Sequence, residues 1–237
     1  MIWQVPRMWE GGDVWIIGGG PSVPKQFNIP DKVIQKVVEG TLPPSSYSKY
    51  MGMLQNKHTI GINVAYLLGD WIDMIFFGDK GFYLKHESKL AEFPGLIVSC
   101  HPEADKLDWI KYTPRDNSRV KGISQDPRKV SWNGNSGSAA ISVAVHAGAK
   151  RIILLGFDMK LNSHNNQHWH DIYKRGQIAD QKGVRGMSQT FDRHLRSFPE
   201  IAKDAKRLGV EILNACPDSA IECFPKFTVK ELLLDNS

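Results

Sequence analysis

The sequence predicts an α/β fold with a mostly parallel sheet and helices on both of its faces. Short runs rich in β-branched and aromatic residues recur along the 237-residue chain, each bounded by turn residues. Helical segments separate several of these runs. The runs are continuously apolar, which is typical of strands that are buried on both sides of a parallel sheet. Together these features predict a Rossmann-like architecture.

The predicted elements follow from local pattern. The expected strands are residues 13–17, 58–62, 73–77, 96–99, 151–155 and 210–213, and the expected helices are 136–147, 198–208 and 228–234. The first helix is rich in small residues, as expected for a helix packed closely on a sheet. Gly209 is placed to end the second helix. Thr228 and Glu231 form a capping-box pattern at the start of the third.

Two segments interrupt this alternation. Residues 26–57 contain Pro30, Gly40 and a Pro-Pro-Ser-Ser turn, and we interpret them as an insertion with one helix. Residues 160–185 are polar, rich in histidine and poorly periodic, which indicates a long loop or lid. Long loops in compact domains are usually functional or disordered. We expect the lid to be mobile without ligand, and 1–237 to form a single nucleotide-binding domain.

Composition narrows the class of protein. Hydrophobic residues make up 41% and charged residues 23%, which argues against disorder. No apolar run approaches the about 18 residues of a membrane-spanning helix, and the N-terminus lacks a signal-peptide pattern. Three cysteines without a CxxC pair favour a reducing compartment, so we expect a cytoplasmic protein. A net charge of +5 fits either a solvated basic surface or a polyanionic partner.

The first candidate site segment follows the first strand. Gly18, Gly19 and Gly20 allow a sharp turn and a close approach to a ligand, and their amides, with the Ser22 hydroxyl, can bind phosphate or ribose oxygens. The segment matches neither the dinucleotide fingerprint nor a P-loop. A tight structural turn remains the alternative interpretation. Ligands of open α/β sheets bind at such strand ends, which favours a nucleotide site.

Polar residues follow three further expected elements. Asn63 can contact a base or ribose, although a capping role is equally open. Asp79 can bind a ribose hydroxyl or a divalent cation. Asn135, Ser136 and Gly137 lie at the start of the small-residue helix, where exposed amides and the helix dipole form an anion site. Simple capping explains one of these three residues but not the whole polar string.

The strongest acid–base candidates come after the strand at 151–155. Asp158 lies just past its end and is followed by His164, His168 and His170. A histidine titrates near neutral pH and can remove a proton from an acceptor hydroxyl. The spacing matches no standard metal motif, so we predict no metal site here. We favour a catalytic base over the two roles that stay open for these histidines, a metal ligand and a surface residue. Among them we favour His168 over His170, and both over His164.

These motifs, in this order, resemble one superfamily: the bacterial lipooligosaccharide sialyltransferases, the motility accessory factors that help glycosylate flagellin, and the archaeal 6-hydroxymethylpterin diphosphokinases. The stretches that carry the resemblance are 17–23, 61–63, 77–79, 135–138, 147–158 and 214–217. The His-Trp-His stretch also resembles phage-encoded members. The likeness spans about residues 13 to 225. It implies a nucleotide site and a transferase activity.

The resemblance implies two mechanisms. The sialyltransferases imply a CMP-sugar donor, a histidine base in the lid, and leaving-phosphate contacts from Tyr173 with Lys174 or Arg175. The diphosphokinases imply instead that Asp79 and Asp158 hold Mg²⁺ against ATP. Asp79 stands where the sialyltransferases tend to carry a neutral amide, and the polar lid departs from the diphosphokinases.

We expect a sialyltransferase-like glycosyltransferase with a histidine base. The alternatives are a Mg²⁺-dependent pyrophosphokinase and a non-catalytic nucleotide-binding protein. The expected partners are a nucleotide and an acceptor, which the sequence leaves open among a glycan, a protein, a small molecule and DNA. Homo-oligomer formation is also left open.

Overall fold

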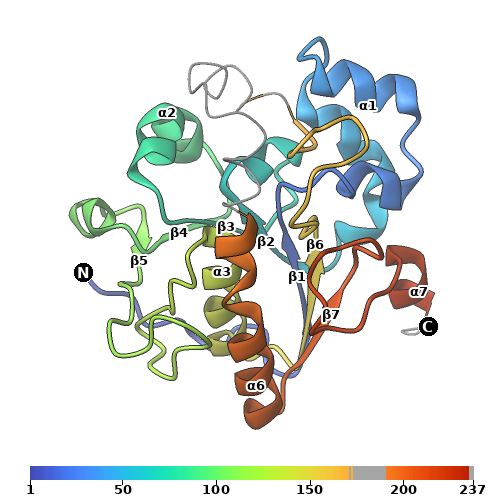
Figure 1. Cartoon of the computed structure of the whole chain (residues 1–237). Helices are drawn as coiled ribbons and strands as arrows, with labels where there is room; N and C mark the ends of the chain where they lie inside the picture. The colour runs from blue at the N-terminus through green and yellow to red at the C-terminus, as the bar shows by residue number, and fades with distance from the viewer. Residues whose placement is uncertain (171, 173–190, 235–237) are drawn as a thin grey trace.

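A computed structural model of the chain (Figure 1) contains a seven-stranded sheet with strand order β5-β4-β3-β2-β1-β6-β7. The structure describes residues 1–170, 172 and 191–234. The strands are β1 (Asp13–Ile17), β2 (His58–Ile62), β3 (Met74–Phe77), β4 (Leu96–Ser99), β5 (Lys111–Tyr112), β6 (Arg151–Leu155) and β7 (Glu211–Asn214). Every neighbouring pair is parallel. The predicted α/β fold is confirmed, and the sheet is wholly parallel.

Helices cover both faces of the sheet (Figure 1). The α-helices are α1 (Asp31–Val38), α2 (Lys80–Ala91), α3 (Ser136–His146), α6 (Phe198–Leu208) and α7 (Val229–Leu234). The 3-10 turns are η1 (Val23–Phe27), η2 (Pro44–Tyr50), η3 (Gly52–Leu54), η4 (Asn63–Leu68) and η5 (Pro102–Lys106). Residues 26–57 therefore contain one α-helix, as predicted, together with 3-10 turns.

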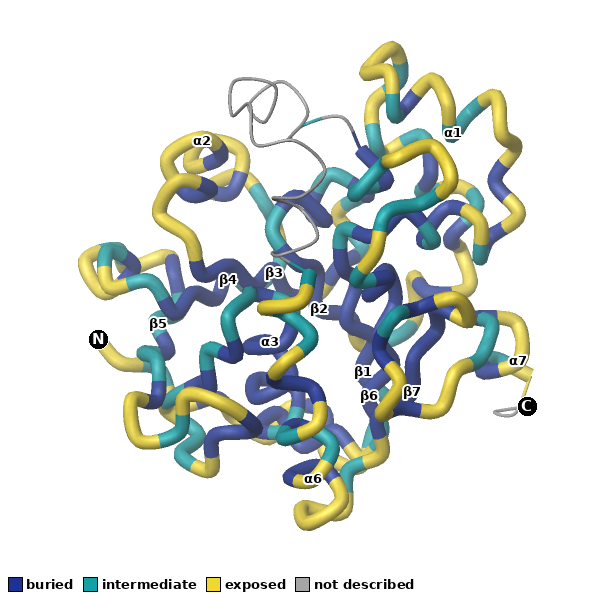
Figure 2. The backbone as a smooth tube through the Cα atoms, in the orientation of Figure 1, coloured by how far each residue is buried: buried dark blue, intermediate teal, exposed yellow. Residues whose placement is uncertain are grey.

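Alternation along each strand divides the core into two layers. On β1, Trp15 and Ile17 pack with α1, α2, α7 and the 3-10 turns, whereas Val14 and Ile16 pack with α3 and α6. The strands are therefore buried on both sides, as Figure 2 shows. This double burial is the reason why they lack a polar face in the sequence.

Helix ends follow the predicted signals. Asn135 Oδ1 accepts a hydrogen bond from the amide of Ser138 at 2.9 Å, which caps α3. Gly209 ends α6 in the left-handed conformation with φ of 68°. Thr228 and Glu231 exchange hydrogen bonds at the start of α7. Local sequence therefore fixes these boundaries.

The order of the strands places a crevice beside β1. Along the chain, β1 is followed by β2 on one side, whereas its other neighbour, β6, arrives much later. Connections leave β1 and β6 in opposite directions, and ligands of open α/β sheets bind where this happens, at the carboxyl ends of the strands. Within the part of the chain that is described, no helix is long and apolar enough to span a membrane.

Candidate active site

A cleft of about 140 Å³ lies at the carboxyl ends of β1, β2 and β6, next to the start of α3. Its lining includes nine of the predicted site residues: Gly18, Gly19, Gly20, Asn63, Asn135, Ser136, Gly137, Asp158 and His168. A neighbouring cavity of about 340 Å³ shares Asp158 and Lys160 with this cleft. The sheet therefore assembles in one place residues that are far apart in the sequence.

The glycine turn, residues 18–20, packs directly on the end of β6. A Cβ on Gly18 would lie 2.7 Å from the Gly156 carbonyl oxygen, and one on Gly20 would lie 1.8 Å from Asp158 Oδ2. The amides of Gly18 and Gly20 donate to the carbonyls of Leu155 and Gly156, at 2.7 and 2.9 Å. These amides therefore hold the turn against β6, whereas the sequence predicted that they would bind a ligand.

Ser22 is also occupied within the protein. Its amide donates to Asp158 Oδ1 at 3.1 Å, and its hydroxyl lies 2.8 Å from Asp158 Oδ2 and 3.2 Å from Cys216 Sγ. Burial raises the pKa of Asp158, and the hydrogen bonds from Ser22 oppose this shift. The structure thus places Ser22 and Asp158 in contact beside the glycine turn, and their predicted ligand-binding and catalytic roles stay predictions.

Asn63 and Asn135 line the cleft, and each has one buried amide atom without a hydrogen-bond partner among the described residues. Asn135 uses Oδ1 to cap α3, and its buried Nδ2 has no hydrogen-bond partner among the described residues. Asn63 begins η4 in the left-handed conformation, with φ of 52°, and its buried Oδ1 likewise lacks a partner there. Two residues of the cleft lining therefore each have a side-chain atom whose hydrogen-bonding capacity is unused among the described residues. Ser136 Oγ differs, since it accepts from the Gly78 amide at 3.2 Å.

Of His168 and His170, only His168 lines the cleft. His168 Nδ1 lies 3.2 Å from the carbonyl oxygen of Gly19. A carbonyl only accepts, so Nδ1 carries the hydrogen and the basic lone pair is on Nε2. Burial lowers the pKa of His168 to about 4, which keeps the ring neutral at pH 7. His170 stacks on His168 with ring centroids 5.0 Å apart and is buried.

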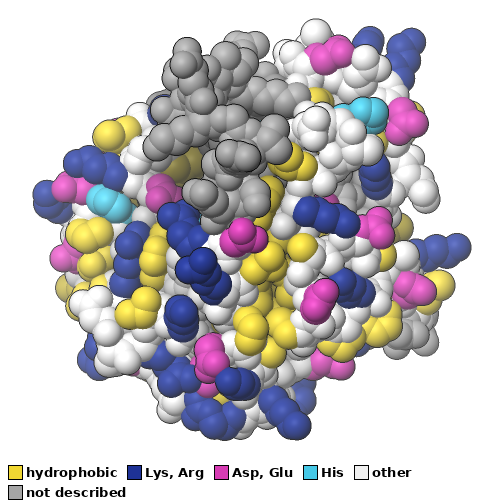
Figure 3. Space-filling view, in the orientation of Figure 1, with side chains coloured by type: hydrophobic (Ala, Val, Ile, Leu, Met, Phe, Trp, Pro, Cys, Tyr) yellow, Lys and Arg dark blue, Asp and Glu magenta, His cyan; other side chains and the backbone are white. Residues whose placement is uncertain are grey.

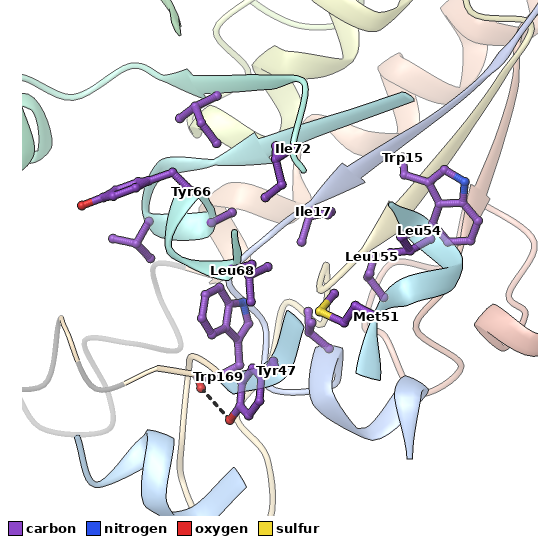
Figure 4. Packing of buried hydrophobic residues seen from close by; sticks show 14 of the residues in the cluster. Trp15, Ile17, Tyr47, Met51, Leu54, Tyr66, Leu68, Ile72, Leu155 and Trp169 are labelled. Atoms are coloured by element: carbon purple, nitrogen blue, oxygen red, sulfur yellow. Dashed lines mark hydrogen bonds between the residues drawn. The ribbon is translucent and has the colours of Figure 1, made fainter. Parts of the chain in front are cut away.

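Trp169 connects residues 168–170 to the glycine turn through hydrogen bonds. Its amide donates to the Gly19 carbonyl at 3.1 Å and its indole Nε1 to the Gly18 carbonyl at 2.9 Å. The Tyr47 hydroxyl donates to the Trp169 carbonyl at 3.3 Å (Figure 4). Trp169 thus ties residues 168–170 to the glycine turn and to η2, and the predicted mobility of the lid stays a prediction. Tyr173, Lys174 and Arg175 lie outside the described residues.

Eight residues of the lining were not predicted as site residues, and Lys160, Phe191 and His194 are among them. Burial lowers the pKa of His194 to about 4, and the nearby Arg193 adds to this shift. His194 therefore offers a second neutral imidazole at the cleft. In the sequence it follows no strand end, and only its place after the polar segment distinguishes it. Lys160 is exposed at the edge and supplies a positive charge.

Asp79 lies apart from this group. It is exposed at the start of α2 and lines neither the cleft nor the cavity beside it. Three strand spacings separate β3 from β6, which is about 14 Å at about 4.8 Å each. Asp79 is therefore not among the described residues that line the cleft with Asp158, and a Mg²⁺ ion shared by the two stays a prediction of the pyrophosphokinase alternative. The described side chains also include no group of three or more metal-ligating residues that could hold a metal ion.

Compared by sequence, the chain matches no protein-family profile and no curated protein. Solved structures do resemble it. The sialyltransferase CstII from Campylobacter jejuni, in complex with the substrate analogue cytidine-5'-monophosphate, superposes with a TM-score of 0.50 at 14% identity, over 92% of this chain and 86% of that one. The MAf glycosyltransferase from Magnetospirillum magneticum AMB-1 gives a TM-score of 0.56 at 13% identity, over 97% of this chain and 35% of that one. The chain therefore has the fold shared by these two glycosyltransferases, as the resemblance of its motifs predicted.

Proposed function

We propose that the chain is a glycosyltransferase that binds a cytidine-nucleotide-activated sugar in the cleft beside β1 together with the neighbouring cavity of about 340 Å³, which shares Asp158 and Lys160 with it. The observation that carries the proposal is that two residues of the cleft lining, Asn63 and Asn135, each have a buried amide atom without a partner among the described residues, Oδ1 and Nδ2 respectively. A buried polar group without a partner costs about 1–3 kcal/mol, and a ligand with its own donors and acceptors removes this cost. The complex of CstII with cytidine-5'-monophosphate supports the choice of a cytidine nucleotide.

The start of α3 is the proposed phosphate site. The first amides of a helix, here those of Ser136 and Gly137, have no carbonyl partner within it, and the helix dipole favours an anion. Asn135 Nδ2 adds a further donor, and Lys160 adds a positive charge at the edge. Donors placed where negative charge develops stabilise a departing phosphate. These groups would therefore assist the release of CMP.

A neutral histidine is the proposed base. The acceptor hydroxyl oxygen forms a bond to the anomeric carbon, the bond from that carbon to the phosphate oxygen breaks, and CMP leaves with the electron pair. The hydroxyl proton passes to an imidazole. His168 and His194 both line the cleft, and burial lowers the pKa of each to about 4. Both rings are therefore neutral at pH 7, which is the form that accepts a proton, and each is a weaker base than a free imidazole.

Calorimetric titration with CMP in EDTA tests the nucleotide site. Asn135→Ser keeps a capping oxygen for α3 and removes Nδ2, and Asn63→Gly keeps access to the left-handed backbone and removes Oδ1. Each variant should lower CMP affinity by at least about tenfold, or 1.4 kcal/mol, while remaining folded. A wild-type chain that binds no CMP, or two variants with wild-type affinity, would refute the site.

Release of CMP from CMP-N-acetylneuraminate, with and without added saccharides, tests the base. His168→Ala or His194→Ala should lower the transfer rate by about 10²- to 10⁴-fold with little change in CMP affinity, and the variant that does so identifies the base. Full rates in both single variants would exclude a histidine base. Tight CMP binding without any release would instead show a non-catalytic binding protein.

A further inference from the structure

A larger cavity, of about 580 Å³, adjoins the nucleotide cleft. Its size is within the range of about 300–1,000 Å³ that is usual for small-molecule sites. It lies between α1 and the loop at 161–169, and among the described residues His168 alone lines both cavities. A molecule bound in this cavity would therefore lie next to a candidate base and next to the bound donor.

The walls of this cavity combine polar and aliphatic side chains. Helix α1 contributes Ile34 and Gln35, which lie one helical turn from the lining residues at positions 31 and 38. The loop contributes Asn162 and Asn166. Side-chain amides both donate and accept hydrogen bonds, which suits hydroxyl groups. Gln35 Nε2 already donates to Glu39 Oε1 at 2.8 Å, so Gln35 would contribute its Oε1 acceptor to a ligand. Aliphatic side chains such as Ile34 suit the C–H faces of a sugar ring.

Among the described residues that line this cavity, the positive and negative charges are equal in number. Lys25 from η1 and Asp31 from α1 are both exposed and both line the cavity. Duplex DNA is bound mainly through several cations that contact its phosphates. One lysine and one carboxylate, the charged residues of the lining among those described, do not provide this. On the face that carries α6, Asp and Glu side chains lie among the Lys and Arg side chains (Figure 3). The cavity therefore suits an uncharged ligand.

Internal hydrogen bonds fix the shape of the cavity. The buried Tyr47 hydroxyl lies 3.3 Å from the Trp169 carbonyl and 3.5 Å from the Ile34 carbonyl, so it joins α1 to the loop. Asn162 Oδ1 accepts from the amides of His164 and Asn166, at 3.0 and 2.9 Å. Both walls are thus held in position before a ligand binds, as in most small-molecule sites.

We infer that this cavity is the acceptor subsite and that its ligand is an uncharged mono- or disaccharide. The inference rests on the proposed function and adds to it the place and the chemical class of the acceptor. The acceptor would present a hydroxyl to His168, opposite the donor. Apart from Pro21 and His168, the residues that line the subsite lie outside the motifs of the nucleotide cleft, and most of them belong to α1 and to the loop at 161–169.

A pair of tryptophan variants on α1 tests the inference. Gln35 is exposed and lines the cavity, so the indole of Gln35→Trp would fill part of it. Lys36 is the next residue, is exposed and does not line the cavity, so Lys36→Trp is the matched control. Transfer from CMP-N-acetylneuraminate to a panel of uncharged mono- and disaccharides should show a KM for the saccharide at least about tenfold higher in Gln35→Trp, which corresponds to 1.4 kcal/mol. Lys36→Trp should match the wild type, and both should keep the wild-type affinity for CMP.

The outcomes separate this inference from the proposed function. If the wild type does not bind CMP, the proposed function fails, and binding of the same saccharides, followed by NMR without donor, tests the cavity alone. Saccharide binding lost in Gln35→Trp but kept in Lys36→Trp supports the subsite. Three results overturn it: equal saccharide KM or binding in the two variants, weaker CMP binding in Gln35→Trp, and transfer to a DNA oligonucleotide but to no saccharide. Absence of saccharide binding by the wild type overturns it as well.

Discussion

Replacing Gly20 with alanine tests how the glycine turn is built. The added Cβ would lie 1.8 Å from Asp158 Oδ2 and 2.6 Å from the Gly156 carbonyl oxygen, so the turn and β6 must separate. Asp158 cannot move away without weakening the two hydrogen bonds from Ser22, at 3.1 and 2.8 Å. A hydrogen bond to a charged group contributes about 1.5–3 kcal/mol, so we expect a loss of about 3 kcal/mol or more in the free energy of unfolding.

Urea unfolding and CMP calorimetry provide the assay. Gly81→Ala is the matched control, because no atom lies within 4 Å of its added Cβ and the residue lies within α2. Alanine favours a helix over glycine by about 1 kcal/mol, so this control should be unchanged or slightly more stable. Gly20→Ala should also lose CMP affinity, since the displaced turn lines the cleft. A Gly20→Ala protein whose free energy of unfolding lies within about 1 kcal/mol of the wild-type value would show that the turn can move at little cost, and would refute this reasoning.

Two further predictions concern protonation and metal. The pKa of His168 is about 4 in the folded chain and about 6.5 in the unfolded chain. Between pH 6.5 and pH 4 only the unfolded chain binds this proton. The free energy of unfolding therefore falls as the pH is lowered through this range. Urea unfolding at pH 7 and pH 5 should show a loss of up to about 2 kcal/mol that is absent in His168→Gln. Equal pH dependence in the two proteins would contradict this. Asp79→Asn should leave CMP binding unchanged with either Mg²⁺ or EDTA, and calorimetry showing a Mg²⁺-dependent loss would favour the pyrophosphokinase.

The strands and the position of the site could be predicted from the sequence. Strands buried on both faces have an apolar pattern that needs no knowledge of their neighbours, and parallel strands bring their carboxyl ends to one edge. Two elements were missed. Strand β5 has only two half-buried residues, and α2 buries His86 and Tyr83 among charged residues, which weakens its pattern.

The details of the site could not be predicted because they depend on distant partners. Nothing near Ser22 in the sequence indicates that its hydroxyl is used by Asp158, 136 residues away. His194 reaches the cleft only because the chain returns to it after the polar segment. Sequence patterns identify which strand ends carry polar residues, but the partners of each polar atom are fixed by tertiary contacts.

The pairing of β1 with β6 also has a consequence for folding. β1 ends at Ile17 and β6 begins only at Arg151, so the centre of the sheet joins segments that are synthesised far apart in time. Contacts of such long sequence separation form slowly, because a long loop must close before they contribute. Until residues near Asp158 have left the ribosome, the glycine turn has nothing to pack against and the cleft does not exist. The ability to bind a ligand would therefore appear late in folding, and in one step with completion of the sheet.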